Sequence, residues 1–286
     1  MTTEEFLRHL QEHTASFAQA IATAEGEWII KGFIDIYQRI YTISVDTKIV
    51  SKVLELLLFP MFVEFAENHD CAIQLSPQQN FYPDLTFIHH GTSAKFAVDI
   101  KSTYRLSPND VNGMTLGAFT GYFRNRDSAK NTTYPYSQYA GHFVLGVIYS
   151  KNLDAADERK HFSLAELEKI PSVIHNFQFF AQPKYRIASA RPGSGNTKNI
   201  GSVTKIDQLL NGTAPFAQLG EEVYDDYWMY YLTADMARSL EVARPYADLK
   251  SYFAYKQRGS EILQKFQDQI EQLPDETSFT DEESTE

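Results

Sequence analysis

Three residues, Asp84, Asp99 and Lys101, have the types and the spacing for metal-assisted chemistry. Strand patterns cover residues 84–89 and 95–101, and the four residues between them suit a hairpin loop. In that register Asp84 lies opposite Asp99, and Lys101 shares the face of Asp99. Two carboxylates about 5 Å apart repel each other unless a cation or a proton lies between them. The pattern therefore favours a hard divalent metal, with Lys101 near enough to serve a phosphate or a water.

The same spacing also has a simpler explanation. A D…DxK pattern occurs by chance in many proteins, and most acidic residues on strands are solvated. The apolar residues of the two strands favour a buried hairpin, because in the predicted register they all turn toward a core on the other face. They are Leu85, Phe87, Phe96, Val98 and Ile100, while Thr86 pairs with Ala97 on the aspartate face.

Length and composition indicate a protein able to bury a sizeable core. The chain has 286 residues and 43% of them are apolar, so we expect residues 1–273 to form one domain. The single cysteine, Cys71, excludes an internal disulfide, and the absence of CxxC or paired histidine motifs argues against structural zinc. The longest apolar run, residues 56–63, is too short to span a bilayer, and the N-terminus is acidic. We therefore expect a cytoplasmic protein without a membrane partner.

The charge of the chain is unevenly distributed. The net charge of −11 argues against a polyanionic partner when it is taken globally. Residues 101–205, however, hold 14 Lys and Arg against 7 Asp and Glu, so a basic middle lies between acidic flanks. An ordinary fluctuation of surface charge would explain this, and so would a nucleic acid bound by the middle third.

Two helices are predicted on the N-terminal side of the aspartates, over residues 3–24 and 47–67. Apolar residues recur in both at helical spacing. They are Phe6, Leu10, Phe17 and Ile21 in the first helix, and Ile49, Val50, Val53, Leu54 and Leu57 in the second. Asp46 is a good N-cap for the second helix, and Pro60 is expected to kink or divide it. Glu55 is either a capped or salt-bridged carboxylate or a third acidic member of the site.

The other segments predict short strands and a helical C-terminal part. Two strands are expected within residues 25–41, joined near Lys31 and Gly32. Further strands are expected over residues 71–75 and, as a buried central strand, over residues 142–150. A short helix over residues 163–169 has a capping-box pattern, and the chain is mostly helical from residue 221 onward. Residues 274–286 form an acidic tail that we expect to be disordered.

Two loops carry side chains that can contact DNA bases. Residues 76–80 contain glutamines and an asparagine, which are ordinary loop residues and can also read base edges. Residues 191–202 are rich in glycine but lack the pattern of a nucleotide-binding P-loop. Their small residues would let backbone amides approach a base edge, while Asn196 could pair with adenine and Thr197 could contact a thymine methyl group. A flexible surface loop would have the same composition.

Four segments resemble the EcoRV family of type II restriction endonucleases, which belongs to the PD…D/ExK nuclease superfamily. They occur in the same order and at similar separations: QQNFYPD at 78–84, VDIKSTY at 98–104, TLGAFTGYFRN at 115–125 and GSGNTKNIGS at 193–202. DTK at 46–48 and the helix with Glu55 extend the resemblance, which covers roughly residues 44–205. Three departures are visible: residues 28–41 look like an insertion, Gly121 replaces an expected serine, and the C-terminal part matches only around residues 225–228.

The resemblance implies a fold and a catalytic apparatus. The fold would be α/β, a restriction-endonuclease-like mixed β-sheet flanked by helices. A homodimer would hold double-stranded DNA in a cleft between the subunits, with the N-terminal part for dimerisation, residues 44–205 as the catalytic and DNA-reading core, and residues 206–273 as a helical part. Mg²⁺ would be the cofactor, and Lys101 the catalytic lysine. The implied metal ligands are Asp84, Asp99, Ile100 and, as an auxiliary carboxylate, Glu55.

The resemblance also implies which residues contact DNA. Gln78, Gln79 and Asn80 would line the minor groove, and the glycine-rich loop would read the major groove. The implied DNA-binding set is Gln78, Gln79, Asn80, Thr103, Thr120, Lys130, Gly193, Ser194, Gly195, Asn196, Thr197 and Asn199. The expected activity is cleavage of GATATC at its centre to leave blunt ends, and a protective DNA methyltransferase is expected in the host. Two rivals remain: a structure-selective repair or junction nuclease, and a DNA-binding protein that does not cleave.

Overall fold

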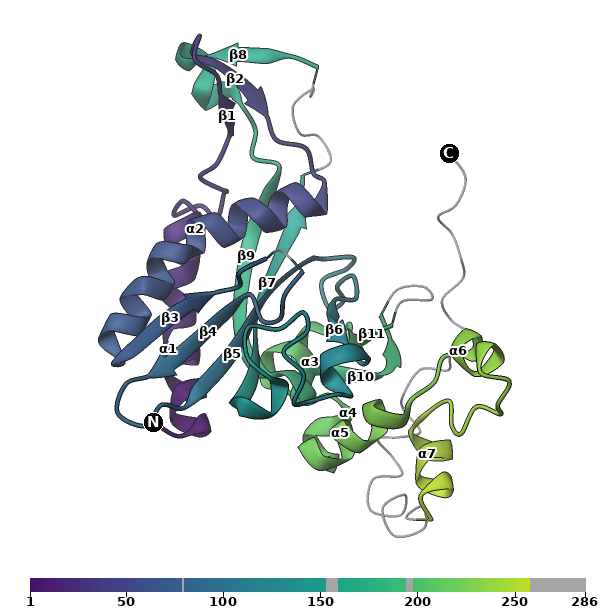
Figure 1. Cartoon of the computed structure of the whole chain (residues 1–286). Coiled ribbons are helices and arrows are strands. Elements are labelled where there is room, and N and C mark those ends of the chain that lie inside the picture. The colour runs from purple at the N-terminus through teal and green to yellow at the C-terminus, as the bar shows by residue number, and fades with distance from the viewer. Residues whose placement is uncertain (79, 153–158, 194–197, 258–286) are drawn as a thin grey trace. The chain divides into compact units, whose positions relative to one another are not determined.

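The computed structural model describes residues 1–78, 80–152, 159–193 and 198–257. The chain divides into two compact units, Met1–Gln218 and Leu219–Glu286. In its described part, the first unit contains three β-sheets and two long helices (Figure 1). The predicted single domain over residues 1–273 would require the two units to pack as one body, and it stays a prediction. Within the described ranges, no helix is long and apolar enough to cross a membrane.

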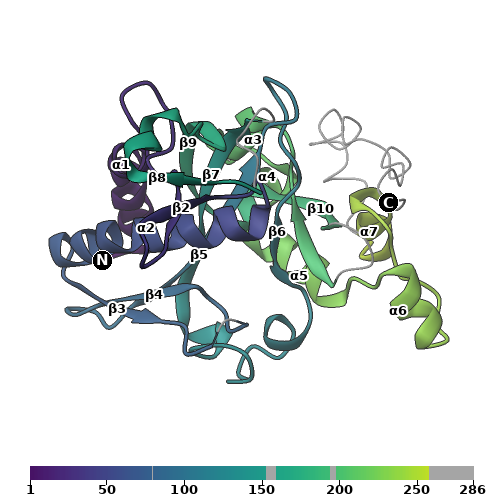
Figure 2. The same cartoon turned by 90° about the horizontal axis from the view of Figure 1, so that it is seen from above.

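The largest sheet has five strands in the order β3-β4-β5-β7-β9. They are β3 (Cys71–Leu75), β4 (Leu85–His89), β5 (Lys95–Tyr104), β7 (Tyr139–Lys151) and β9 (Ile174–Pro183). Only β5 and β7 pair in parallel, so the sheet is mixed, as predicted. Figure 2 shows this order from above, with β3 and β4 at the lower edge of the sheet. The buried strand predicted over residues 142–150 is β7, which has a partner on each side.

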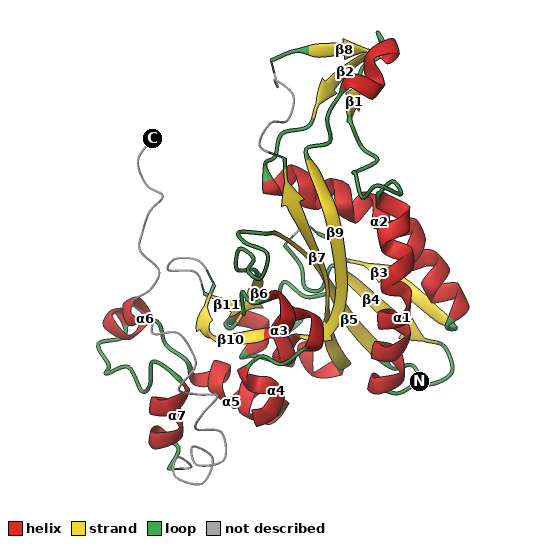
Figure 3. Cartoon of the chain, turned by 180° about the vertical axis from the view of Figure 1, so that it is seen from behind, coloured by secondary structure: helices red, strands yellow, loops and turns green. Residues whose placement is uncertain are grey.

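Helices α1 (Thr3–Ile21) and α2 (Thr47–Asn68) cover one face of this sheet (Figure 3). All four apolar residues that recur at helical spacing in α1 are buried in the core, which accounts for a pattern that a subunit contact would have explained equally well. A capping box at Thr2 and the Asp46 cap, which accepts from the N–H groups of Lys48 and Ile49, fix the helix starts. In α2 the prediction was wrong for Ile49, which is 38% exposed because it lies on the same outer face of the helix as the exposed Leu56, two turns further on. The helix also continues through Pro60 without dividing.

A second sheet of three strands extends from the end of β7 and β9 (Figure 1). It consists of β1 (Gly32–Ile34), β2 (Arg39–Thr42) and β8 (His161–Ser163), and η3 (Leu164–Lys169) follows it with the predicted capping box. The predicted position of the turn near Lys31 and Gly32 was wrong. The chain reverses instead after Asp35, whose carboxylate accepts hydrogen bonds from the backbone of Tyr37 and Arg39 and so stabilises a turn there.

The third sheet contains the glycine-rich hairpin. Its order is β10-β11-β6, with β6 (Thr115–Ala118), β10 (Ala188–Pro192) and β11 (Asn199–Ser202). Short helical segments surround it: η1 (Gly121–Phe123), η2 (Tyr136–Gln138), η4 (Lys184–Ile187), α3 (Ile206–Asn211) and α4 (Pro215–Leu219). The segment 191–202 is therefore a hairpin between two strands, although residues 194–197 lie outside the described residues.

The second unit is helical in its described part, as predicted. It contains α5 (Glu221–Tyr230), α6 (Ala234–Ser239) and α7 (Leu249–Tyr255). Tyr227 contacts the rings of Trp228, Tyr231, Tyr246 and Tyr252, and these five rings form its aromatic cluster. The predicted acidic tail, residues 274–286, lies outside the described residues.

Two leucines of α2 test how the core stabilises the fold. Leu58 is fully buried in the cluster that joins α1, α2 and the sheet, whereas Leu56 is 64% exposed. Leu58→Ala is expected to lower the free energy of unfolding by about 2–5 kcal/mol, because it removes buried methyl groups and leaves a cavity. Leu56→Ala is the control and should change that free energy by no more than about 0.5 kcal/mol. Urea denaturation would measure both, and equal losses would contradict the assigned packing of α2.

Candidate active site

The β4–β5 hairpin brings the two predicted aspartates together. Leu85 pairs with Val98 and Thr86 with Ala97, which is the register predicted from the sequence. Asp84 directly precedes β4, and its N–H donates to Asp99 Oδ1 at 3.3 Å. Its own Oδ2 accepts a hydrogen bond of 2.8 Å from the N–H of Ile100. The carboxylate of Asp99 is thus bonded to the backbone of Asp84, that of Asp84 is bonded to the backbone of Ile100, and the two share one face of the sheet.

Lys101 lies between the carboxylates. Its Nζ is 3.4 Å from Asp84 Oδ2 and 3.6 Å from Asp99 Oδ2. The side chain of Asp99 is only 5% exposed, while those of Lys101 and Asp84 are 24% and 33% exposed. The cluster is therefore accessible from the side of Asp84 and Lys101, and Asp99 forms its buried base.

Burial and charge change the acidity of the cluster. Burial raises the pKa of the Asp84 carboxyl above its usual value, Lys101 opposes this, and Asp99 adds to it. Burial alone would lower the pKa of Lys101, but the two aspartates outweigh it and raise that pKa above its usual value. Lys101 is therefore protonated at neutral pH and can act as a cation and hydrogen-bond donor.

The donor set fits a hard divalent cation only in part. Two carboxylates are oxygen ligands of the kind that Mg²⁺ prefers, with water and phosphate completing its coordination. Among the described residues, no group of three His, Cys, Asp or Glu side chains is arranged to hold a metal. Glu55 pairs with Lys52 at 2.7 Å, which is the salt-bridged alternative of the two left open by the sequence. Its charge still helps to raise the pKa of Asp84, so it lies near the cluster.

A second lysine beside the aspartates was missed by the sequence reasoning. Lys184 is the first residue of η4, and its Nζ is 3.9 Å from Asp99 Oδ2 and 4.1 Å from the centre of the Tyr82 ring. It is 3% exposed. A basic residue directly after an apolar strand is the only signal in the sequence that could have suggested it.

Aromatic residues surround this buried lysine. The ring of Tyr82 stacks on those of Tyr122 and Tyr136, and its hydroxyl makes a 2.7 Å hydrogen bond with His142 Nδ1. Burial lowers the pKa of His142 well below its usual value, with further lowering by Lys184 and Arg126, so this imidazole is neutral. The cluster therefore excludes water behind Asp99 without adding another charge.

The residues predicted to line the minor groove lie next to the aspartates. Gln78 and Asn80 are exposed in the connection between β3 and β4, and Gln79 lies outside the described residues. Lys130 is exposed in a loop that joins the same region, because the N–H of Tyr82 donates to the carbonyl of Asn131. These positions form a polar margin of the hairpin that is accessible to a large ligand.

Two residues of the predicted DNA-binding set, Thr103 and Thr120, differ in accessibility. Thr120 is half-buried at the start of η1 and makes no capping hydrogen bond with its side chain. Thr103 is buried, and its hydroxyl donates to the carbonyl of Asn112 at 2.5 Å. Alternation along β5 puts Thr103 on the face that carries Asp99 and Lys101, but its hydroxyl is already bonded to Asn112, and its predicted role in DNA binding stays a prediction.

The residues predicted to read the major groove fall in the segment between β10 and β11. Gly193 donates its N–H to the carbonyl of Asn199 at 2.8 Å, which closes the described base of the hairpin. A Cβ at Gly193 would lie 2.7 Å from Thr115 Cγ2, so a side chain would press against β6. Asn199 pairs with Ala118 of β6. Ser194, Gly195, Asn196 and Thr197 lie outside the described residues, so their predicted roles stay predictions.

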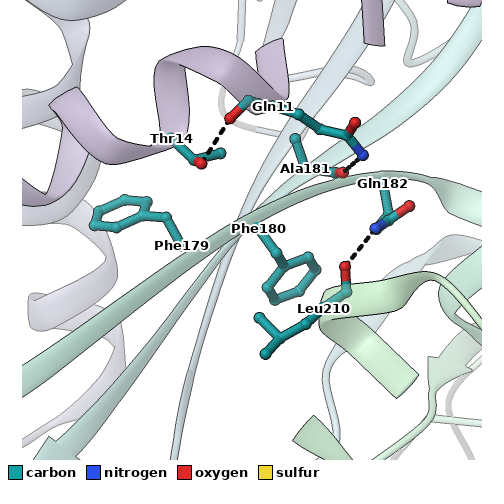
Figure 4. Close-up of a pocket in the computed structure, with 7 residues that line it drawn as sticks. All are labelled: Gln11, Thr14, Phe179, Phe180, Ala181, Gln182 and Leu210. Atoms are coloured by element: carbon teal, nitrogen blue, oxygen red, sulfur yellow. Dashed lines mark hydrogen bonds between the residues drawn. The ribbon is translucent and has the colours of Figure 1, made fainter. Parts of the chain in front are cut away.

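A pocket of about 280 Å³ lies elsewhere, between α1, β9 and α3 (Figure 4). Its lining consists of Gln11, Thr14, Phe179, Phe180, Ala181, Gln182 and Leu210. None of these side chains is ionisable, and none belongs to the predicted site. The pocket therefore offers no group for acid–base or metal chemistry.

The mixed sheet, the D…DxK hairpin and the exposed Gln78 and Asn80 beside it are typical of nucleases of the PD…D/ExK class. Residues 24–257 match the family model described as restriction endonuclease EcoRV. The type II restriction enzyme EcoRV of Escherichia coli is 34% identical over 210 residues, which are 73% of this chain and 84% of that enzyme. The chain belongs to the EcoRV family of restriction endonucleases. It is a type II restriction endonuclease, a site-specific deoxyribonuclease.

Proposed function

We propose that this enzyme is a homodimer that uses Mg²⁺ to cut double-stranded DNA at GATATC, at the centre of the site, to leave blunt ends. The observation that carries the proposal is the cluster of Asp84, Asp99 and Lys101 on one hairpin. The site sequence follows from the GSGNTKNIGS segment, whose resemblance to the family extends through the base-reading positions.

The residues of the cluster have separate tasks in phosphodiester hydrolysis. Asp84 and Asp99 would hold the Mg²⁺, which when bound withdraws charge from the scissile phosphate and lowers the pKa of a water. Lys101 is protonated and partly exposed, so it can donate to a phosphate oxygen or orient the attacking water. Oxygen from water then bonds to phosphorus, the bond to the 3′ oxygen breaks in line with it, and a proton goes to the departing oxygen.

The small β1-β2-β8 sheet supports the homodimer. Several large apolar side chains of this region are exposed, and Ile36 at its turn reaches 89%. They include Phe33, Ile34, Ile36, Tyr37 and Leu164. Monomeric proteins rarely expose such a cluster, and a two-fold pair of copies would cover it. A two-fold dimer would also present two identical active sites to the two strands of a palindrome.

The specificity follows from the chemistry of base edges. In a GAT half-site, guanine offers acceptors to the amides of Gly193 or Gly195, adenine offers N6 and N7 to Asn196, and thymine offers a methyl group to Thr197. Two-fold symmetry repeats these contacts as GATATC.

The metal site is tested by removing its carboxylates. Asp84→Ala or Asp99→Ala should reduce plasmid cleavage at least about 10³-fold, since both hold the charge that stabilises the transition state. Lys101→Ala should reduce turnover similarly while DNA binding, measured by gel retardation, stays intact. Asp235→Ala is the control, because Asp235 is half-exposed on α6 and pairs with Arg238. Cleavage near the unmodified rate by either of the first two variants would falsify the assignment.

The dimer is tested through Ile36. Ile36→Lys should shift the sedimentation coefficient from that of a dimer to that of a monomer, because a charge would have to be buried in the interface. Leu240→Lys changes a leucine that is exposed in the second unit and should leave the dimer intact. A dimer that survives Ile36→Lys at all protein concentrations would place the interface elsewhere.

The recognition sequence is tested on a plasmid of known sequence with Mg²⁺, by sequencing the ends. We expect blunt ends at GATATC only. Asn196→Ala should slow cleavage there roughly 5-fold to 150-fold, which corresponds to the loss of one bidentate base contact. Ends at another sequence, or staggered ends, would refute the proposed site, while nicks at junctions or retardation without cuts would favour the two rival functions.

A further inference from the structure

Lys184 is a buried cation in direct reach of the active site. Its side chain is 3% exposed. Lys184 directly follows β9 and begins η4, which is separate from the β4–β5 hairpin. A buried ammonium group is costly unless a negative charge and further polar contacts compensate it. Its placement beside Asp99 therefore calls for an explanation in the chemistry of the site.

The surroundings hold the ammonium group in a defined place. Its Nζ lies over the face of the Tyr82 ring at 4.1 Å from the centroid, a cation–π contact. On another side it approaches the backbone of β6, because a Cβ at Gly117 would lie 3.6 Å from Nζ and 2.9 Å from the Tyr122 hydroxyl. Gly117 has a φ of +95°, which favours glycine at this close approach. The ammonium group thus occupies a cradle formed by two aromatic residues and a glycine.

Two lysines approach the Asp99 carboxylate, and they differ in how exposed their side chains are. Both ammonium groups approach the same oxygen, Oδ2, at 3.6 Å for Lys101 and 3.9 Å for Lys184, while Oδ1 accepts from the N–H of Asp84. Lys101 is 24% exposed and can reach a substrate, whereas Lys184 is too deeply buried to contact DNA. At 3.9 Å the interaction with Lys184 acts through charge rather than through a directed hydrogen bond.

We propose that Lys184 is a positioning residue, a fixed interior cation that holds the Asp99 carboxylate in its metal-binding orientation when Lys101 turns to the scissile phosphate. This inference rests on the proposed function of the same site. Without Lys184 and without metal, Lys101 would be the one cation left beside Asp99 among the residues that the structure describes, and Lys101 and Asp99 would form a closer pair. In that pair Asp99 would no longer be free to bind the metal, and Lys101 would no longer be free to reach the scissile phosphate.

The test compares three lysine variants of the full-length enzyme. Lys184→Met keeps the length of the side chain and removes its charge, and Lys184→Arg keeps the charge. Lys95→Met is the matched control, since Lys95 on β5 also lies over a tyrosine ring, that of Tyr134 at 4.9 Å, but has no part in the site. Mn²⁺ binding is followed by electron paramagnetic resonance, and cleavage of a GATATC plasmid gives kcat and KM.

Lys184→Met should weaken Mn²⁺ binding and lower kcat by about 10-fold to 100-fold each, the usual effect of removing a group that orients a metal ligand. The KM for DNA should stay within about 2-fold, since Lys184 does not contact the substrate. Lys184→Arg should recover part of both losses, and Lys95→Met should cause neither.

Other results would contradict either the proposal or the proposed function on which it rests. Mn²⁺ binding that is unchanged in folded Lys184→Met overturns the proposal, because Lys184 would then have no part in positioning the metal ligand. Tighter Mn²⁺ binding also overturns it, because the charge of Lys184 would then only repel the metal. If neither Lys184→Met nor Lys184→Gln folds by circular dichroism, Lys184 is a structural charge and the proposal also fails. If the unmodified enzyme neither binds Mn²⁺ nor cleaves, it is the proposed function that fails.

Discussion

Burial of the Asp99 carboxylate is the constraint on which the rest of the site depends. A carboxylate that is 5% exposed must be compensated by hydrogen bonds or by cations. The β4–β5 register supplies the N–H of Asp84, β5 itself supplies Lys101, and the end of β9 supplies Lys184. Each compensating group lies on a different segment, so the acidic site forms only when the hairpin and the far strand of the sheet have come together.

The parallel pairing of β5 with β7 makes this assembly possible. A parallel pair requires a long crossover, and here the connection from Tyr104 to Tyr139 contains β6, η1 and η2. That connection carries Gly117 and Tyr122 to Lys184, and β6 pairs with the glycine-rich hairpin through β11. The segment that closes the cradle behind Asp99 is therefore continuous with the sheet from which the proposed base-reading loop extends, which would link the catalytic and the recognition elements of the proposed function.

Local patterns in the sequence predicted the catalytic hairpin but could not predict its buried base. Alternation over residues 84–101 determines both the register and the shared face of Asp84, Asp99 and Lys101, because these contacts are set by the period of a strand. The contact of Lys184 with Asp99 joins residues far apart in the chain, and no local period encodes it. The pairing of β8 with β2 was missed for the same reason. The turn at Asp35 was missed because Gly32 suggested a turn at its own position. The turn is instead stabilised by hydrogen bonds from the backbone to the Asp35 side chain.

The basic residues of the segment 101–205 show why a count of charges does not locate a DNA-binding surface. Arg105 donates to the carbonyl of Asn176, Lys205 pairs with Asp110, and Lys151 lies over the ring of Tyr104. With Lys101 and Lys184 at the aspartates, a large part of the excess positive charge serves the fold and the active site. Among the described residues, exposed cations such as Lys130 remain available to neutralise phosphates, so in the proposed function affinity would rest on a few positioned contacts more than on bulk attraction. An acidic protein can therefore bind DNA through the geometry of its loops, which is also the property that sequence-specific cleavage requires.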